Sequence, residues 1–196
     1  MHRATAMAIA AVLGVFGVTA ASAADQPLPA RRLLMVDIPG HGELFHNAKH
    51  EDLDVHVPAP GGPDDPTTVG GTLLVYNPAT CESATFDMPA SGWRIAHAES
   101  ALAFKFVNRS APAGPSPIFV AVIGVDRVKV RARASGITLD ESSQGSLGVV
   151  VTLGSQRYCT LFGGFVTRDQ PGVFTGRLAP APASCPPTSC VPSAAP

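Results

Sequence analysis

Short apolar runs, each ended by turn residues, recur along most of the chain. Residues 71–76 (GTLLVY), 118–123 (IFVAVI) and 147–153 (LGVVVTL) are such runs, and Asn-Pro or Gly follows each of them. Residues 126–134 alternate between polar and apolar side chains, the period of a strand with one face in water. Short β-rich runs bounded by Gly, Pro and Asn are typical of β-sandwiches and barrels. The run at 118–123 is apolar at every position, so we expect both of its faces to be buried.

The same criteria predict further strands elsewhere. These lie at residues 32–38, 83–88, 102–107, 157–162 and 166–174. Residues 43–57 fit either a strand or a short helix. No long segment after residue 23 repeats apolar residues with the period of a helix, which excludes a doubly wound α/β fold. We predict an all-β protein, a single antiparallel two-sheet β-sandwich of about 8–10 strands.

The first 23 residues have the pattern of an export signal. A short basic start, Met1-His2-Arg3, precedes an apolar stretch at 6–18 that is too short to span a bilayer, and Ala21-Ser22-Ala23 forms a cleavage site. Cleavage after Ala23 would leave a secreted or periplasmic chain. We expect a frayed start at 24–30, a sandwich domain over 24–178 and a Pro/Ala-rich tail over 179–196.

Export changes how the four cysteines are interpreted. An even number of cysteines in an oxidising compartment favours two disulfides, and four cysteines allow three pairings. Two prolines stiffen the segment between Cys185 and Cys190, which disfavours a direct link between them. We therefore expect each tail cysteine to reach the sandwich, Cys159 with Cys185 and Cys81 with Cys190, although the spacing alone does not select this pairing. The spacing fits no zinc finger.

The charge composition limits the classes of binding partner that we expect. The chain has 14 Lys and Arg against 15 Asp and Glu, a formal net charge of −1, and only 15% charged residues. A nucleic-acid-binding domain is usually strongly basic, so we expect no nucleic-acid partner. No apolar run after the signal is long enough for a membrane span. An envelope protein or an acidic polysaccharide remains as a partner, and the sequence does not give the oligomeric state.

Several of these runs together resemble a known kind of protein. GTLLVYN, DMPASGW, VKVRARASGITL and SQGSLGVVVTLGSQRYCTLFGG, followed by a cysteine in a Pro-rich end, are similar to a group of exported, mostly uncharacterised bacterial proteins. The resemblance covers roughly residues 70–185. It implies a β-rich secreted domain with a Cys159–Cys185 link, and its relatives often lack a counterpart of Cys81. It implies no activity.

The alternating strand carries the first candidate site. Arg127, Lys129, Arg131 and Arg133 share one face of that strand, where they can meet an anionic polymer. The alternative is a solvated outer face, on which charges also protect an edge strand from aggregation. Trp93 follows Pro89 and Gly92 and is the candidate for stacking against a sugar, with packing in the core as the alternative.

Histidines give the second candidate site. His41, His46, His50 and His56 lie close together in the sequence, among four carboxylates. Imidazole and carboxylate are ligands for zinc, copper and nickel, but binding requires three of them to converge. The alternative is a polar segment at the edge of a sheet.

No set of residues predicts catalysis. The sequence around Ser146 departs from the G-x-S-x-G nucleophile elbow, and we expect no helix after it. We therefore predict no catalytic residues and no cofactor. The leading hypothesis is an exported, non-enzymatic structural or interaction module; a carbohydrate- or polyanion-binding module is the alternative, and a metal-assisted hydrolase at His41 to His56 the second alternative.

Overall fold

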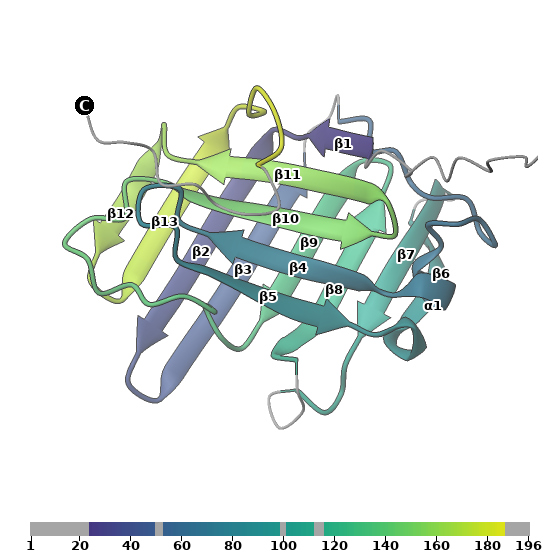
Figure 1. Cartoon of the computed structure of the whole chain (residues 1–196), viewed down its shortest axis with the longest axis horizontal. Helices are drawn as coiled ribbons and strands as arrows, with labels where there is room; N and C mark the ends of the chain where they lie inside the picture. The colour runs from purple at the N-terminus through teal and green to yellow at the C-terminus, as the bar shows by residue number, and fades with distance from the viewer. Residues whose placement is uncertain (1–23, 50–52, 99–100, 112–115, 187–196) are drawn as a thin grey trace, which may run out of the picture.

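The chain folds into two β-sheets packed face to face (Figure 1). This computed structural model describes residues 24–49, 53–98, 101–111 and 116–186. In Figure 1 the strands of the front sheet run across the picture and those of the back sheet run steeply behind them, so the two sheets cross at a large angle. The predicted two-sheet β-sandwich is confirmed.

The front sheet has five strands in the order β1-β11-β10-β4-β5. Their bounds are Ala24–Pro27 for β1, Gly71–Tyr76 for β4, Ser83–Met88 for β5, Leu147–Leu153 for β10 and Gln156–Phe162 for β11. β1 pairs in parallel with β11, and the other pairs are antiparallel. β10 lies in the centre of the sheet and is buried along almost its whole length, as its apolar run predicts.

The back sheet has eight strands in the order β12-β13-β2-β3-β9-β8-β7-β6, all antiparallel to their neighbours. The bounds are Ala30–Ile38 for β2, His41–Lys49 for β3, Trp93–Ala98 for β6, Ala101–Val107 for β7, Ile118–Gly124 for β8, Arg127–Ala132 for β9, Val166–Gln170 for β12 and Val173–Ala179 for β13. A helical turn, α1 (Pro66–Val69), and a 3-10 turn, η1 (Ala90–Gly92), complete the elements.

A single apolar core fills the space between the sheets. Tyr158 and Phe162 point into it from the front sheet, and Leu33, Leu44 and Phe104 from the back sheet. In β3 and β9 of the back sheet alternate residues are buried, because successive side chains of a strand point to opposite faces. The side chains between the buried ones point away from the core and form the outer surface of the back sheet.

The strand count exceeds the prediction, since the described residues form thirteen strands. The frayed start expected at 24–30 contains β1, which is held by backbone hydrogen bonds to β11 and gives no side-chain pattern. The ambiguous segment contains β3, with Leu44, His46 and Ala48 buried in alternation. The expected strand at 166–174 is a hairpin of β12 and β13 around Pro171 and Gly172.

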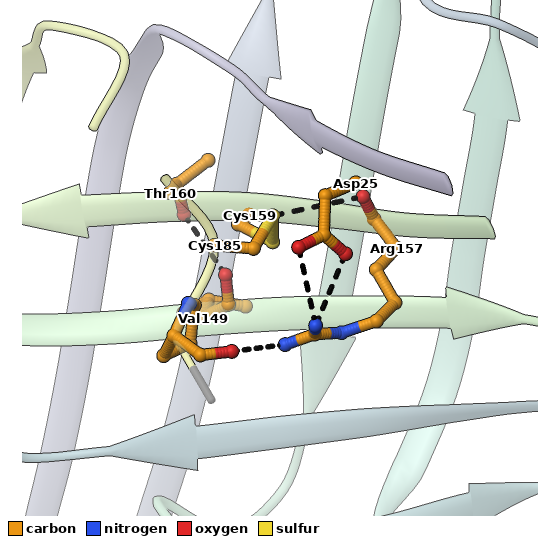
Figure 2. Close-up of a disulfide and its surroundings, with 7 residues drawn as sticks. Asp25, Val149, Arg157, Cys159, Thr160 and Cys185 are labelled. Carbon is orange, nitrogen blue, oxygen red and sulfur yellow. Dashed lines mark hydrogen bonds and ion pairs between the residues drawn. A yellow bond between two sulfur atoms is a disulfide. The ribbon is translucent and has the colours of Figure 1, made fainter. Parts of the chain in front are cut away.

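The described residues after β13, 180–186, reach the outer side of the front sheet and are fixed there by the Cys159–Cys185 disulfide (Figure 2). Cys185 packs with Tyr76, Val150 and Cys159 in a small apolar cluster on that side. Cys81 is also disulfide-bonded. Its expected partner, Cys190, lies outside the described residues. The predicted boundary at 178/179 falls one residue early, because β13 continues to Ala179, whose side chain is buried.

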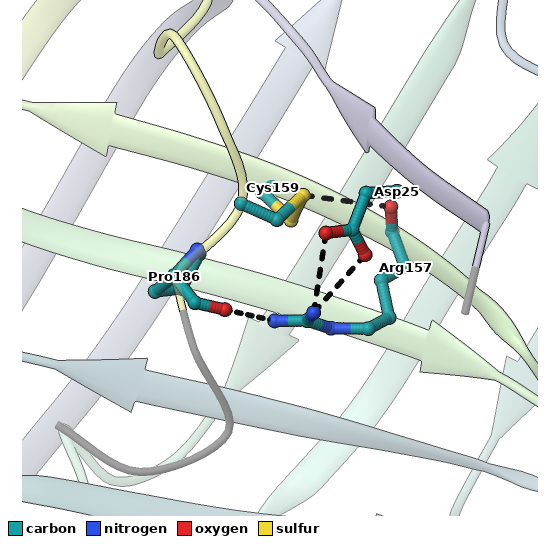
Figure 3. A network of polar contacts seen from close by, with 5 residues as sticks. Asp25, Arg157, Cys159 and Pro186 are labelled. Carbon is teal, nitrogen blue, oxygen red and sulfur yellow. Dashed lines mark hydrogen bonds and ion pairs between the residues drawn. A yellow bond between two sulfur atoms is a disulfide. The ribbon is translucent and has the colours of Figure 1, made fainter. Parts of the chain in front are cut away.

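Arg157 joins the two ends of the described chain (Figure 3). Its Nη1 donates to Asp25 Oδ1 in β1 at 3.0 Å, and its Nη2 donates to the carbonyl oxygen of Pro186. Only 13% of the Arg157 side chain is exposed, so this ion pair is partly shielded from water. The front sheet is thus covered on its outer side near β11, whereas the back sheet carries no such covering segment among the described residues.

Candidate anion-binding face

The candidate site lies on the outer face of the back sheet. β9 buries Val128, Val130 and Ala132 and turns Arg127, Lys129 and Arg131 outward, as the alternation predicts. Arg133 follows the strand and is exposed. The four residues of the basic stripe therefore lie side by side on one surface.

Two phenylalanines from neighbouring strands lie among these cations. Phe45 of β3 pairs with Arg131, and its ring has three cations within 5.7 Å of its centre, which belong to Arg32, Lys129 and Arg131. The ring of Phe119 has the guanidinium carbons of Arg131 and Arg133 at 5.4 and 5.5 Å. We call these residues the basic face: Arg32, Phe45, Phe119, Lys129, Arg131 and Arg133.

Phe119 reaches this face because β8 departs from regular pairing. The register between β8 and β9 shifts between Ile118 and Val120, where a bulge places an extra residue in the strand. Ile118 stays buried, and Phe119 and Val120 are both only half-buried. The expectation that residues 118–123 are buried on both faces is wrong, because β8 is a strand of a sheet with only one covered side.

Acidic residues neutralise only part of this charge. Glu43 Oε1 lies 4.0 Å from Arg131 Nη2. Asp126 Oδ1 lies 2.7 Å from Arg127 Nε, and Asp126 Oδ2 lies 3.9 Å from Lys49 Nζ. The hydrogen bond from Arg127 holds the pKa of Asp126 below its usual value, so this carboxylate stays ionised. Among the described residues, Arg32, Lys129 and Arg133 have no acidic side chain within 4.0 Å.

The protein separates its charges by face. The register places ten cations on the outer side of the back sheet, Arg32, Lys49, Arg94, Lys105, Arg127, Lys129, Arg131, Arg133, Arg168 and Arg177. Most described acidic residues lie elsewhere. Asp169, for example, is next to Arg168 but points the other way, where Ser143, Gln144 and Gly145 donate to it. A chain with a net charge of −1 thus presents one strongly positive surface.

Trp93 is not part of that surface. Its side chain is only 6% exposed, its ring packs against Phe106 at 5.5 Å, and its Nε1 donates to the carbonyl oxygen of Met88. The proposed sugar-stacking role of Trp93 is therefore not available in this fold. Of the two alternatives given for Trp93, the structure shows packing in the core, since the residue begins β6 with its indole directed inward.

The histidines do not converge. β3 turns His41 outward, where it lies 3.9 Å from Glu43, and buries His46 in the core. The two residues are an odd number of positions apart on one strand, so they occupy opposite faces. His56 is exposed, and His50 lies outside the described residues. Within the described part of the chain, no three His, Cys, Asp or Glu side chains are grouped to hold a metal ion.

His46 has a different environment, which its sequence neighbours do not indicate. It is 1% exposed, its Nε2 lies 3.0 Å from Thr160 Oγ1 across the two sheets, and the ring stands edge-on to Phe162. Its Nδ1 has no hydrogen-bond partner. Burial lowers the pKa of His46 from 6.5 to about 3, so the imidazole is neutral in the folded protein.

Comparisons with known proteins identified no similar protein. No protein-family model matches the sequence, and neither the curated proteins nor the solved structures contain a match. The resemblance to exported bacterial proteins therefore stays an expectation. Among the described residues, no helix has the length and hydrophobicity needed to cross a bilayer.

Proposed function

We propose that this protein is an exported, non-enzymatic binding module that holds an acidic polysaccharide on the basic face. The observation that carries the proposal is the grouping of four cations around the rings of Phe45 and Phe119, with Glu43 as the one acidic side chain within 4.0 Å of any of them among the described residues. Crowded cations repel one another, and a bound polyanion removes that repulsion. The positive charge of the site is thus balanced only when an anionic ligand is bound.

The phenylalanines hold the cations in place. A guanidinium or ammonium group over an aromatic ring is attracted by the electrons of the ring face, which restricts the side chain without neutralising it. The N–H groups at the rim of each guanidinium stay available for carboxylate or sulfate oxygens, which they bind in pairs. A preordered donor loses less conformational entropy on binding than a free side chain does.

The same rings argue against single-stranded nucleic acid. Binding of such a strand relies on bases stacked on open aromatic faces. Cations already lie within 5.7 Å of the centres of both rings, so a base has no free face on which to stack. A saccharide carboxylate needs only the guanidinium donors.

Export supports a ligand of this class. The export signal expected at residues 1–23, with cleavage after Ala23, would bring the mature chain outside the cytoplasm, where acidic polysaccharides occur. The Cys159–Cys185 disulfide agrees with an oxidising compartment. The disulfide fixes Cys185 on the front sheet, and among the described residues no segment covers the outer side of the back sheet.

A matched pair of double variants tests the proposal. We expect Lys129→Gln with Arg131→Gln to lower the affinity for polygalacturonate on the order of tenfold, since each exposed ion pair contributes up to about 1 kcal/mol. The control is Arg31→Gln with Arg109→Gln, which removes the same charge from exposed residues outside the basic face and should leave the affinity within about twofold. Calorimetry at low salt gives both values.

Two further results would decide against the proposal. Binding to the wild-type protein should weaken as salt is raised, because the Debye length falls from about 8 Å at physiological ionic strength to about 3 Å at 1 M. Affinity that does not change with salt, or an equal loss in both double variants, would assign the ligand to another surface.

A further inference from the structure

A second line of cations crosses the basic face at right angles to the stripe of β9. The strand register places Arg177, Arg32, Asn47, Lys129, Val122, Lys105 and Arg94 opposite one another in succession, from β13 to β6. Residues paired in this way have side chains on the same face. We call this set the transverse row, and it contains five cations from five different strands.

The sequence gives no sign of this row. Its members come from positions 32 to 177, and the two that are closest in the chain, Val122 and Lys129, are seven positions apart on different strands. The row spans six strand spacings of about 4.8 Å, or about 29 Å. It shares only Lys129 with the stripe at 127–133.

The transverse row is free of acidic neighbours. None of its five cations lies within 4.0 Å of an acidic side chain among the described residues. Both acidic residues of this face contact cations outside the row, Glu43 contacting Arg131 and Asp126 contacting Arg127 and Lys49. The stripe along β9 is therefore partly neutralised by the protein, whereas the transverse row is not.

The gaps in the row carry neutral side chains. Asn47 lies between Arg32 and Lys129, and its amide offers a donor and an acceptor to sugar hydroxyls. Val122 lies between Lys129 and Lys105 and is half-buried. Uncharged contacts thus separate the central Lys129 from a pair of cations at each end of the row.

We propose that the acidic polysaccharide lies across the strands, along the transverse row from Arg177 to Arg94. This proposal rests on the proposed function and adds the path of the ligand. A flexible linear chain suits the surface better than a flat array of anions such as a membrane, because adjacent strands are rotated by about 20° and the outer face of an eight-stranded sheet is twisted.

Two double variants with the same change in charge test the path. Arg94→Gln with Arg177→Gln removes the ends of the row, and Arg127→Gln with Arg133→Gln removes the ends of the stripe. For long oligogalacturonates we expect the first pair to lower affinity about tenfold and the second no more than about threefold. Restoring the charge with Arg94→Lys and Arg177→Lys should recover most of the affinity. Thermal unfolding of each variant confirms that it is folded.

Ligand length gives an independent readout. The affinity of the wild-type protein should rise with oligomer length until the chain spans about 29 Å, and then level off. In the variant without Arg94 and Arg177 it should level off at a shorter length. A surface that binds anions without a path would show no such difference.

The outcomes separate this proposal from the function itself. A larger loss in the stripe variant places the ligand along β9, and equal losses indicate a planar ligand; either result overturns the transverse path and leaves anion binding intact. Binding to vesicles containing phosphatidylglycerol, but not to polygalacturonate, would overturn the polysaccharide as ligand. No binding of the wild-type protein to either one would overturn both proposals.

Discussion

Acidification from pH 7 to pH 4.5 should lower the free energy of unfolding by about 2–3 kcal/mol through His46 alone. The pKa of His46 falls from 6.5 to about 3 on folding, so the unfolded chain takes up a proton in this range and the folded chain does not. The stabilisation is complete above pH 6.5 and decreases as the pH falls toward 3. The geometry gives the same sign, since a protonated imidazole carries a donor on Nδ1, which has no acceptor in the core.

Urea unfolding of His46→Leu measures this contribution. Leucine cannot titrate, and Thr160 keeps a weak hydrogen bond from Oγ1 to the carbonyl oxygen of Val149, at 3.4 Å. We expect the variant to lose most of the pH dependence between 7 and 4.5. The control His41→Leu, at an exposed histidine on the same strand, should retain the wild-type dependence. An unchanged pH dependence in His46→Leu would show that another group controls acid unfolding.

The aspartates with shifted pKa values titrate below the pH range in which His46 affects stability. The pKa values of Asp65, Asp126 and Asp169 are lowered from 3.8, by hydrogen bonds that outweigh burial for Asp65 and Asp169 and chiefly by Arg127 for Asp126. Their contributions are present above the ordinary value and are lost only as the pH falls below it. Between pH 6.5 and 4.5 these three groups are ionised in the folded protein and mostly ionised in the unfolded chain, so they contribute little to the pH dependence there.

Removal of the Cys159–Cys185 disulfide should cost about 3 kcal/mol. The link has a sequence separation of 26 residues, and a closed loop of that size restricts the unfolded chain substantially. For a chain of this length the melting temperature should fall by about 10 °C. Loss of the link also releases the segment that covers Tyr76 and Val150 on the front sheet.

Thermal unfolding of Cys159→Ala with Cys185→Ala, without reductant, tests this prediction. Alanine at 159 fits the buried position without leaving an unpaired thiol. The basic face lies on the other sheet, so the variant should bind polygalacturonate with wild-type affinity below its melting temperature. A melting temperature equal to that of the wild type would show that Arg157 and packing hold the tail without the disulfide.

The strands with apolar runs or strict alternation could be predicted because their local pattern mirrors burial. β10 is apolar because it lies in the centre of its sheet, and β9 alternates because one of its faces is in water. β1 could not be predicted, since it is held by backbone pairing to β11 and its side chains remain largely exposed. The choice between core packing and surface exposure for Trp93 stayed open for a related reason, because the turn residues before it do not show which way the next strand turns its side chains.

The sequence by itself determined the all-β class and the outward stripe of β9, and it limited the four cysteines to three possible pairings. The class and the stripe follow from periodicity along single strands, which is a local property, whereas the structure decided that Cys159 pairs with Cys185. The tertiary structure alone decided that Arg32, Phe45 and Phe119 join the stripe, that five cations align across the sheet, and that His46 is isolated in the core. Each of these depends on the order and register of strands, which join positions far apart in the chain and leave no mark in any single segment.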